Sequence, residues 1–282
     1  MAHSSRRSAY TIRRAYSGEH IQAAARGIPR GCCHLGFETS DPGQQHLRAL
    51  LALGIFNGGR LQQRPGGWGM APVTHYDLIL SPRLDNLVVI TPTPSNVLQY
   101  LVPRGMPVGL PGLRLEFATD DAFLLRHLTT GARMTVTDRP PAPPFESDFD
   151  EDRVWNARQE LTSGEQEALA DVPPVSGAAM VLLAGLMTRI GLNDPKRRWA
   201  LGNWFMDPLD RTREWAADPG RRLWGHGDRW ELTWGSFPFR EDVAAALTGA
   251  KIGIAGAYAV KVRRGWDIRL GDAVLALRSE DR

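Results

Sequence analysis

Histidines beside carboxylates are the residues of this chain that could transfer protons. His75 and Asp77 are two residues apart in an apolar stretch, so on a strand they share one face, where the carboxylate could orient the imidazole as a general base. His226 lies between Gly225 and Gly227 in a segment rich in tryptophan and arginine, and it is the second candidate. Surface pairs of this kind are common without catalysis, so neither histidine alone predicts an enzyme.

Metal-binding and nucleophile motifs are weak in this sequence. Asp148, Asp150 and Asp152 alternate and could share a divalent cation, but they lack the glycine and the distal glutamate of an EF-hand, and a solvated acidic linker explains them better. Cys32 and Cys33 are the only cysteines, and no histidine lies at zinc-finger spacing. The sequence therefore predicts no disulfide framework, no metal site, no cofactor and no assigned catalytic residue.

Arginine dominates the basic residues. The 282-residue chain has 34 Lys and Arg residues, of which only Lys196, Lys251 and Lys261 are lysine, and its formal charge is +3. The first 64 residues contain nine arginines and three carboxylates, a net charge of +6. Because the planar guanidinium binds two phosphate oxygens at once, clustered arginine favours a polyanionic partner. A GC-rich genome would also raise the arginine content, so composition alone is weak evidence.

Two segments combine arginine with tryptophan and glycine. Gly58 to Gly69 contains five glycines, two arginines and one tryptophan, and it matches neither a phosphate-binding P-loop nor a dinucleotide motif. The competing interpretation is a hairpin loop whose tryptophan packs on the core. Residues 197–230 also interleave arginine with tryptophan, which offers phosphate contacts beside stacking surfaces. The predicted nucleic-acid-binding residues are Arg13, Arg14, Arg60, Arg64, Trp68, Arg221, Arg222, Trp224, His226 and Arg229.

The elements that hold these residues are predicted from periodicity. Leu113 to Thr137 has strand-like alternation at both ends and Phe123 and Leu128 at helical spacing between them, which predicts strand, helix, strand. Similar patterns occur at Leu35 to Leu61 and at Trp230 to Val262. These units predict an α+β fold with mixed or antiparallel sheets. They suggest an internal repeat, although independent segments with ordinary caps and turns would give the same pattern.

A change of composition divides the chain. Residues 139–152 join a proline run to an acidic block, which is typical of a linker. We expect a basic helical segment at 1–30, an α+β lobe at 31–138, and a helical segment followed by a second α+β lobe at 153–282. No apolar run reaches the roughly 20 residues of a membrane helix, and no secretory signal pattern is present. We therefore expect a cytoplasmic protein without a membrane partner.

Three classes of function fit these features. The first is an intracellular, non-enzymatic accessory protein that binds nucleic acid through surfaces rich in arginine, tryptophan and glycine. The second is a metal-dependent phosphodiester hydrolase, or another enzyme, that uses the acids at Asp148 and Asp150, or His75 or His226. The third is a scaffold or assembly subunit that binds a protein partner or a second copy through exposed apolar patches. The sequence favours the first.

Overall fold

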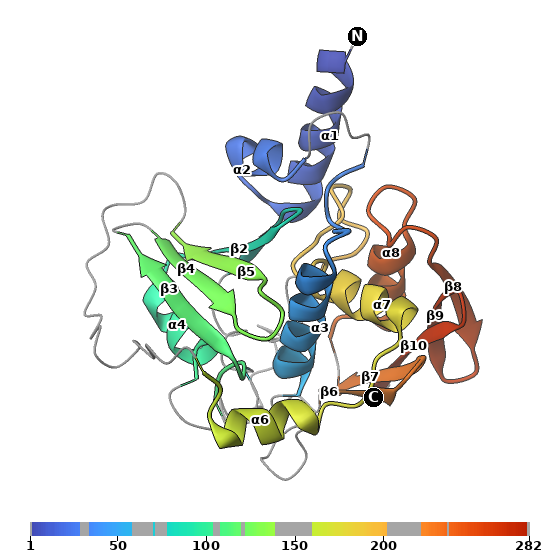
Figure 1. Cartoon of the computed structure of the whole chain (residues 1–282). Helices are drawn as coiled ribbons and strands as arrows, with labels where there is room; N and C mark the ends of the chain where they lie inside the picture. The colour runs from blue at the N-terminus through green and yellow to red at the C-terminus, as the bar shows by residue number, and fades with distance from the viewer. Residues whose placement is uncertain are drawn as a thin grey trace, which may run out of the picture.

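Two five-stranded sheets lie on either side of two central helices in the computed structural model of this chain (Figure 1). The structure describes residues 2–28, 34–57, 70, 78–103, 108–119, 122–138, 160–201, 221–235 and 237–280. Seven helices and ten strands occur in this part of the chain, and both sheets are mixed. The predicted α+β class is confirmed, and the two sheets correspond to the two predicted lobes.

The N-terminal lobe runs from helix α3 to strand β5. Its elements are α3 (Pro42–Phe56), β1 (Ile79–Pro82), β2 (Asn86–Ile90), α4 (Pro94–Leu101), β3 (Leu113–Ala118), β4 (Ala122–His127) and β5 (Arg133–Thr137). The strand order is β1-β2-β5-β4-β3; β2 and β5 are parallel, and the other neighbours are antiparallel. Asp41 caps α3 by accepting a hydrogen bond from the Gln44 amide at 3.0 Å, and Pro42 occupies the first turn, where a missing amide hydrogen costs nothing.

The C-terminal lobe repeats this arrangement. Its elements are α7 (Gly177–Met187), β6 (Arg222–His226), β7 (Arg229–Gly235), α8 (Arg240–Thr248), β8 (Tyr258–Val262), β9 (Gly265–Leu270) and β10 (Ala273–Glu280). The strand order is β6-β7-β10-β9-β8, again with one parallel pair, β7 and β10. Each lobe is therefore helix, two strands, helix, three strands, with equivalent strands in equivalent places.

This structural repeat differs from the repeat expected from the sequence. The helix predicted inside Leu113 to Thr137 is wrong, because β3, β4 and β5 form an antiparallel meander there. Phe123 and Leu125 of β4 are buried while Leu124 between them is exposed, which is the period of a strand. The segment near Leu35 is not a strand either, so the three similar stretches of sequence are not equivalent in structure.

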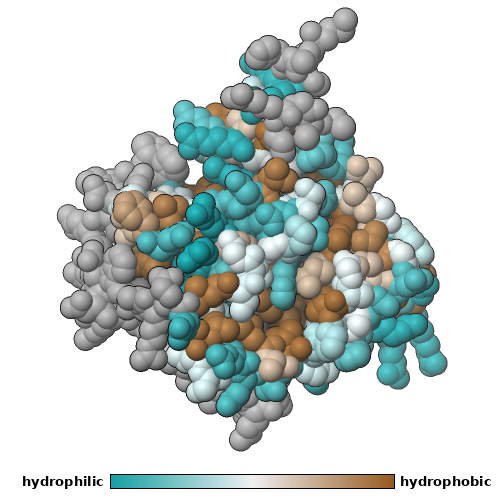
Figure 2. Space-filling model, viewed as in Figure 1, coloured by the Kyte–Doolittle hydropathy of each residue, from teal (hydrophilic) through white to brown (hydrophobic). Residues whose placement is uncertain are grey.

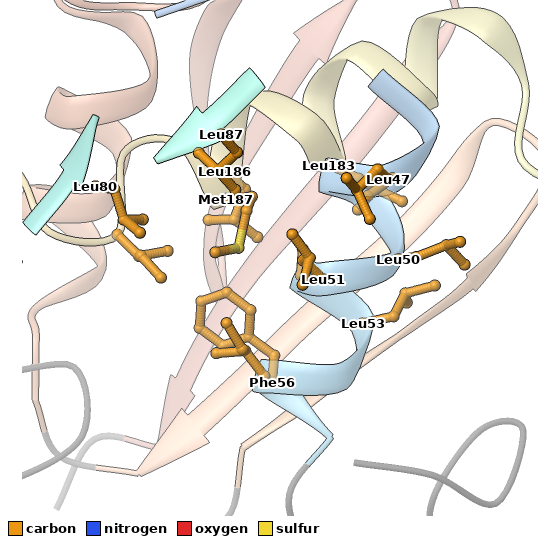
Figure 3. Packing of buried hydrophobic residues seen from close by; sticks show 14 of the residues in the cluster. Leu47, Leu50, Leu51, Leu53, Phe56, Leu80, Leu87, Leu183, Leu186 and Met187 are labelled. Atoms are coloured by element: carbon orange, nitrogen blue, oxygen red, sulfur yellow. The ribbon is translucent and has the colours of Figure 1, made fainter. Parts of the chain in front are cut away.

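One hydrophobic core crosses both lobes, and α3 and α7 meet at its centre (Figure 3). Helix α7 has no charged residue, as expected for a helix surrounded by protein. The labelled side chains of Figure 3 are all buried, and they come from both helices and from β1 and β2: Leu47, Leu50, Leu51, Leu53, Phe56, Leu80, Leu87, Leu183, Leu186 and Met187. The two lobes thus share a single core.

Three further helices complete the described structure. Helices α1 (Ala2–Ser17) and α2 (Ile21–Arg26) form a hairpin at one end of the molecule, and α6 (Ser163–Ala170) lies at the other end (Figure 1). Helix α6 begins with a capping box between Thr162 and Glu165. None of the helices in the described ranges is both long and apolar enough to cross a membrane.

Candidate nucleic-acid interface

The C-terminal sheet has one buried face and one open face. On β7, Trp230, Leu232 and Trp234 are buried, whereas Arg229 and Glu231 between them are exposed. Helices α7 and α8 both contact β9 and β10 and cover the buried face. The opposite face, which we call the open face, carries polar and aromatic side chains into solvent.

Cross-strand register brings four of the predicted residues together on the open face. Strands β6 and β7 are antiparallel, and they place Trp224 opposite Glu231 and His226 opposite Arg229. Side chains alternate along a strand, so Arg222 points to the same side as Trp224 and His226. Sequence reasoning selected these residues separately, and the pairing of β6 with β7 makes them neighbours.

Strands β9 and β10 extend the open face with two more arginines. Arg278 donates a hydrogen bond to the Asp267 carboxylate at 2.8 Å, and the Arg269 guanidinium lies 3.5 Å from the same carboxylate. Arg278 also lies 4.0 Å from the Glu231 carboxylate, so these two arginines are balanced by two acids. Arg222 and Arg229, in contrast, are exposed and make no ion pair with any described residue. The free positive charge of the open face is therefore concentrated on β6 and β7.

Trp224 is the exposed tryptophan of this face. It is 38% exposed, and the Arg222 guanidinium lies 6.0 Å from its ring centroid, within cation-π range. Trp230 and Trp234 belong to the core, and their indole N–H groups donate to the carbonyls of Gly227 and Pro238 at 3.0 and 2.7 Å. Trp224 therefore presents an aromatic surface to solvent while its neighbours in sequence stabilise the fold.

The glycines beside His226 have structural reasons. Gly227 has a φ of +59°, which L side chains rarely adopt, and a Cβ on Gly225 would lie 2.2 Å from the Arg229 carbonyl oxygen. His226 itself is exposed, and no described carboxylate orients its imidazole by a hydrogen bond. The geometry around His226 therefore gives no support for a general base.

Two predicted contact residues are buried instead. Arg13 is 0% exposed, and its guanidinium donates to Glu19 at 2.7 and 2.8 Å and to the carbonyls of Gly27 and Pro82 at 2.9 and 2.8 Å. The expectation that Arg13 contacts a ligand is wrong, because all its donors hold the fold together. Arg221 is also buried, which corrects the same expectation for that residue. Arg14 is exposed on α1.

The remaining candidates lie outside the described residues. These are the predicted contact residues Arg60, Arg64 and Trp68, and the candidates for catalysis or metal binding His75, Asp77, Asp148, Asp150, Asp152, Cys32 and Cys33. Within the described ranges, no three His, Cys, Asp or Glu side chains gather where they could hold a metal ion. The open face is thus the site at which described geometry and predicted residues coincide.

Several arginines are buried and stabilise the fold. Arg114 binds the Glu165 carboxylate at 2.7 and 2.8 Å, and Arg189 binds Glu38 and the Ile252 carbonyl. Arg48 donates to backbone carbonyls, and burial lowers its pKa to about 10. Sequence composition does not separate these arginines from exposed ones, because the difference depends on where the chain places their partners.

Comparison of the chain with protein-family models, with curated proteins and with solved structures found no match. The functional interpretation therefore depends on the geometry of the open face.

Proposed function

We propose that this protein binds single-stranded nucleic acid on the open face of its C-terminal sheet, without catalysing a reaction. The observation that supports the proposal is the exposed Trp224 between two arginines, Arg222 and Arg229, that make no ion pair within the described residues. A base stacked on Trp224 would place its phosphates within reach of these arginines. Because a base in a duplex is already stacked on its neighbours, an aromatic ring on a sheet favours a single strand. An intracellular location, where such strands occur, is part of the proposal.

The acids of the open face determine where a strand could lie. Asp267 pairs with Arg269 and Arg278, whereas Glu231 is exposed, lies 4.0 Å from Arg278 and stands directly opposite Trp224. A phosphate close to Glu231 would be repelled, so the backbone is expected to follow Arg222 and Arg229. A carboxylate at this position could accept a hydrogen bond from the exocyclic amine of the stacked base.

Binding of a fluorescent single strand of about 20 nucleotides at low salt tests the proposal. Trp224→Ala should weaken binding by roughly 5- to 150-fold, since stacking on an aromatic residue contributes about 1 to 3 kcal/mol per base. Arg222→Ala and Arg229→Ala should each reduce the slope of log K against log salt by about 0.7, the value for one phosphate contact on a single strand.

Two controls keep this test specific. Phe239→Ala removes another exposed aromatic side chain, at the start of α8, and Arg264→Ala removes an exposed arginine in the β8–β9 turn. Both variants should bind like the unmodified protein. The proposal fails if the unmodified protein shows no salt-sensitive binding, or if Trp224→Ala binds as tightly as Phe239→Ala.

A role as an assembly subunit is the second candidate, and one observation on the other lobe favours it. Phe117 and Leu124 face each other across β3 and β4 and are 55% and 37% exposed. Figure 2 shows hydrophobic side chains at the surface over this end of the sheet. A protein partner or a second copy could cover them. Light scattering of the unmodified protein and of a Phe117→Ser, Leu124→Ser variant tests for self-association through this patch.

A further inference from the structure

We propose that the helical hairpin of α1 and α2 is a second phosphate-binding surface, with Arg7, Arg14 and Arg26 as its contact residues. The inference rests on the proposed function and extends it to a part of the molecule separate from the open face. In Figure 1 the hairpin lies at the upper end of the molecule, whereas β6 and β7 lie toward the lower end.

The charge of the hairpin has one sign. Residues 2–28 contain five arginines and a single carboxylate, Glu19. Glu19 is buried and forms an ion pair with the buried Arg13, so its negative charge is neutralised inside the fold. Among the described side chains of this segment, the exposed ionisable groups that remain are Arg7, Arg14, Arg26 and His20. The described side chains of residues 6–28 therefore present no exposed carboxylate that would repel a polyanion.

Arg7 and Arg14 form a row along the axis of α1. Arg7 and Arg14 are seven residues apart on α1, so they lie on one side of the helix, about 10 Å apart along its axis. Neither makes an ion pair with a described residue. Arg6 differs, because its guanidinium donates to the carbonyls of Ala25 and Ile28 and ties the two helices together.

Arg7 lies in the second turn of α1, outside the last turn in which the helix dipole stabilises a cation, so the dipole does not explain its position. Arg14 lies in the last turn, where a cation stabilises the helix, so that arginine has a structural benefit as well. Binding of an anionic ligand is a role that Arg7 and Arg14 could share.

The hairpin is held rigidly against the rest of the chain. Arg13 bonds to carbonyls of three separate segments, at Gly27, Leu35 and Pro82. The Tyr16 carbonyl accepts a hydrogen bond from the Asn193 amide at 2.9 Å, and the Tyr16 ring stacks on Trp199 with centroids 6.1 Å apart. Because the surface is ordered before binding, little conformational entropy is lost when a ligand arrives.

Nucleic acid fits this surface better than a membrane does. Interfacial helices insert large apolar side chains beside their basic residues. Here Tyr10, Ile12 and Tyr16 pack against the core, and Ile21 is the exposed large apolar residue of the segment among its described side chains. Figure 2 shows mainly hydrophilic colour over the described part of the hairpin.

The length of the nucleic-acid strand distinguishes binding at the hairpin from binding at the open face. A strand of about six nucleotides would occupy the open face alone, while one of about 30 could reach the hairpin as well. Engagement of both surfaces by one strand raises the overall affinity, because the second contact is intramolecular. The hairpin should therefore matter for long strands and not for short ones.

The test compares an Arg7→Glu, Arg14→Glu variant with a Lys251→Glu, Arg264→Glu variant of equal net charge. All four residues are exposed, and circular dichroism should show both variants folded. For the 30-nucleotide strand, the hairpin variant should bind at least 10-fold more weakly than the charge-matched control, with a salt slope reduced by about 1.4. For the six-nucleotide strand, the two variants should be equal.

Three results would overturn the inference. The first is equal loss in the two variants for the long strand, which would mean a general charge effect. The second is weakened binding of the short strand by the hairpin variant. The third is that the hairpin variant loses binding to vesicles of anionic phospholipid but still binds nucleic acid like the control, which would make the hairpin a membrane contact. Failure of the proposed function looks different, because then Trp224→Ala would have no effect on either strand.

Discussion

The two sheets of this protein have the same strand order, and they differ in what their outer faces expose. In the N-terminal lobe, Val88, Ile90 and Thr135 lie on the side of the sheet turned away from α3, and all three are buried. In the C-terminal lobe, Arg222 and Trp224 occupy the corresponding side and reach solvent. The same side of the N-terminal sheet also carries Arg126 and Arg133, but both pair with Glu116, whereas Arg222 and Arg229 make no ion pair with a described residue. One backbone arrangement thus supports two faces with different charge pairing, so the fold alone does not determine function.

The lobes also differ in how they use charge. Arg114 of the N-terminal lobe forms a buried pair with Glu165 of α6, and His127 is buried. On the open face of the C-terminal lobe, the charged pairs around Arg278 and Asp267 are partly exposed. Removal of a charge should therefore be costly at the Arg114–Glu165 pair and mild on the open face.

The largest effect is expected from Glu165→Gln. This change removes the carboxylate from a buried ion pair with Arg114, and it should lower the free energy of unfolding by about 3 to 5 kcal/mol. Urea denaturation measures the loss. Glu231→Gln on the open face, whose carboxylate is exposed and 4.0 Å from Arg278, should cost less than about 1 kcal/mol. Equal costs would break the comparison between the lobes.

The pH dependence of stability gives the second test. Burial alone would raise the pKa of Glu165, but hydrogen bonds from Arg114 and from the amides of Thr162 and Gly112 lower it to about 2. Desolvation lowers the pKa of His127 to about 4. Both groups bind fewer protons in the folded state than in the unfolded state, so the free energy of unfolding should fall as the pH falls. The His127 contribution is lost between about pH 6.5 and pH 4, and the Glu165 contribution between about pH 4.5 and pH 2.

For His127 the loss should reach about 3 kcal/mol at pH 4. Urea unfolding of His127→Gln at pH 7, 5.5 and 4 should show a smaller decline than the unmodified protein. The matched control is His226→Gln on the open face, whose free energy of unfolding should decline as much as that of the unmodified protein. A protein equally stable at pH 7 and pH 4 would contradict the role of His127.

A smaller effect is expected at the contact between the lobes. The Asn57 side chain, at the end of α3, donates to the Leu223 carbonyl at 2.8 Å and accepts from the Leu223 amide at 2.9 Å. Asn57→Ala leaves both buried backbone groups of β6 unsatisfied, so it should cost about 1 to 3 kcal/mol in thermal or urea unfolding. Asn96→Ala at an exposed position of α4 should change stability by less than about 0.5 kcal/mol.

The smallest effect on stability is expected at Trp224. Trp224→Ala should change the free energy of unfolding by less than about 1 kcal/mol, because this residue is 38% exposed and lies on the open face of an edge strand. Trp230→Ala, which empties a buried position one strand away, should cost about 3 to 5 kcal/mol. Thermal melts of the two variants measure the difference. A large loss at Trp224 would make it a structural residue.

Local signals in the sequence account for several elements of the fold. Asp41 and Pro42 mark the start of α3, the apolar run after Ser176 marks α7, and the turns at Gly265 and Gly271 separate β8, β9 and β10. These features depend on residues close in sequence. The equivalence of the two lobes depends on which distant strands pair, and no local pattern encodes that.

The candidate site was predicted in part. Arg222, Trp224, His226 and Arg229 are neighbours because β6 pairs with β7 across a short turn, which sequence spacing could indicate. Arg13 was misassigned because nothing local shows that its partner is Glu19 and that Pro82, 69 residues away, supplies a carbonyl. A lone carboxylate in a basic segment is the signal that could have identified the buried pair.

The packing of α3 against α7 has a consequence for how the chain folds. The strands of each sheet come from one short stretch of the chain, residues 79–137 or 222–280, yet the helix that begins each lobe buries its apolar side chains against the other lobe. Loss of either lobe would uncover Leu47 and Leu51 or Leu183 and Leu186 to water. Heat or denaturant should therefore unfold both lobes in one cooperative transition, and neither lobe should persist alone as a partly folded intermediate.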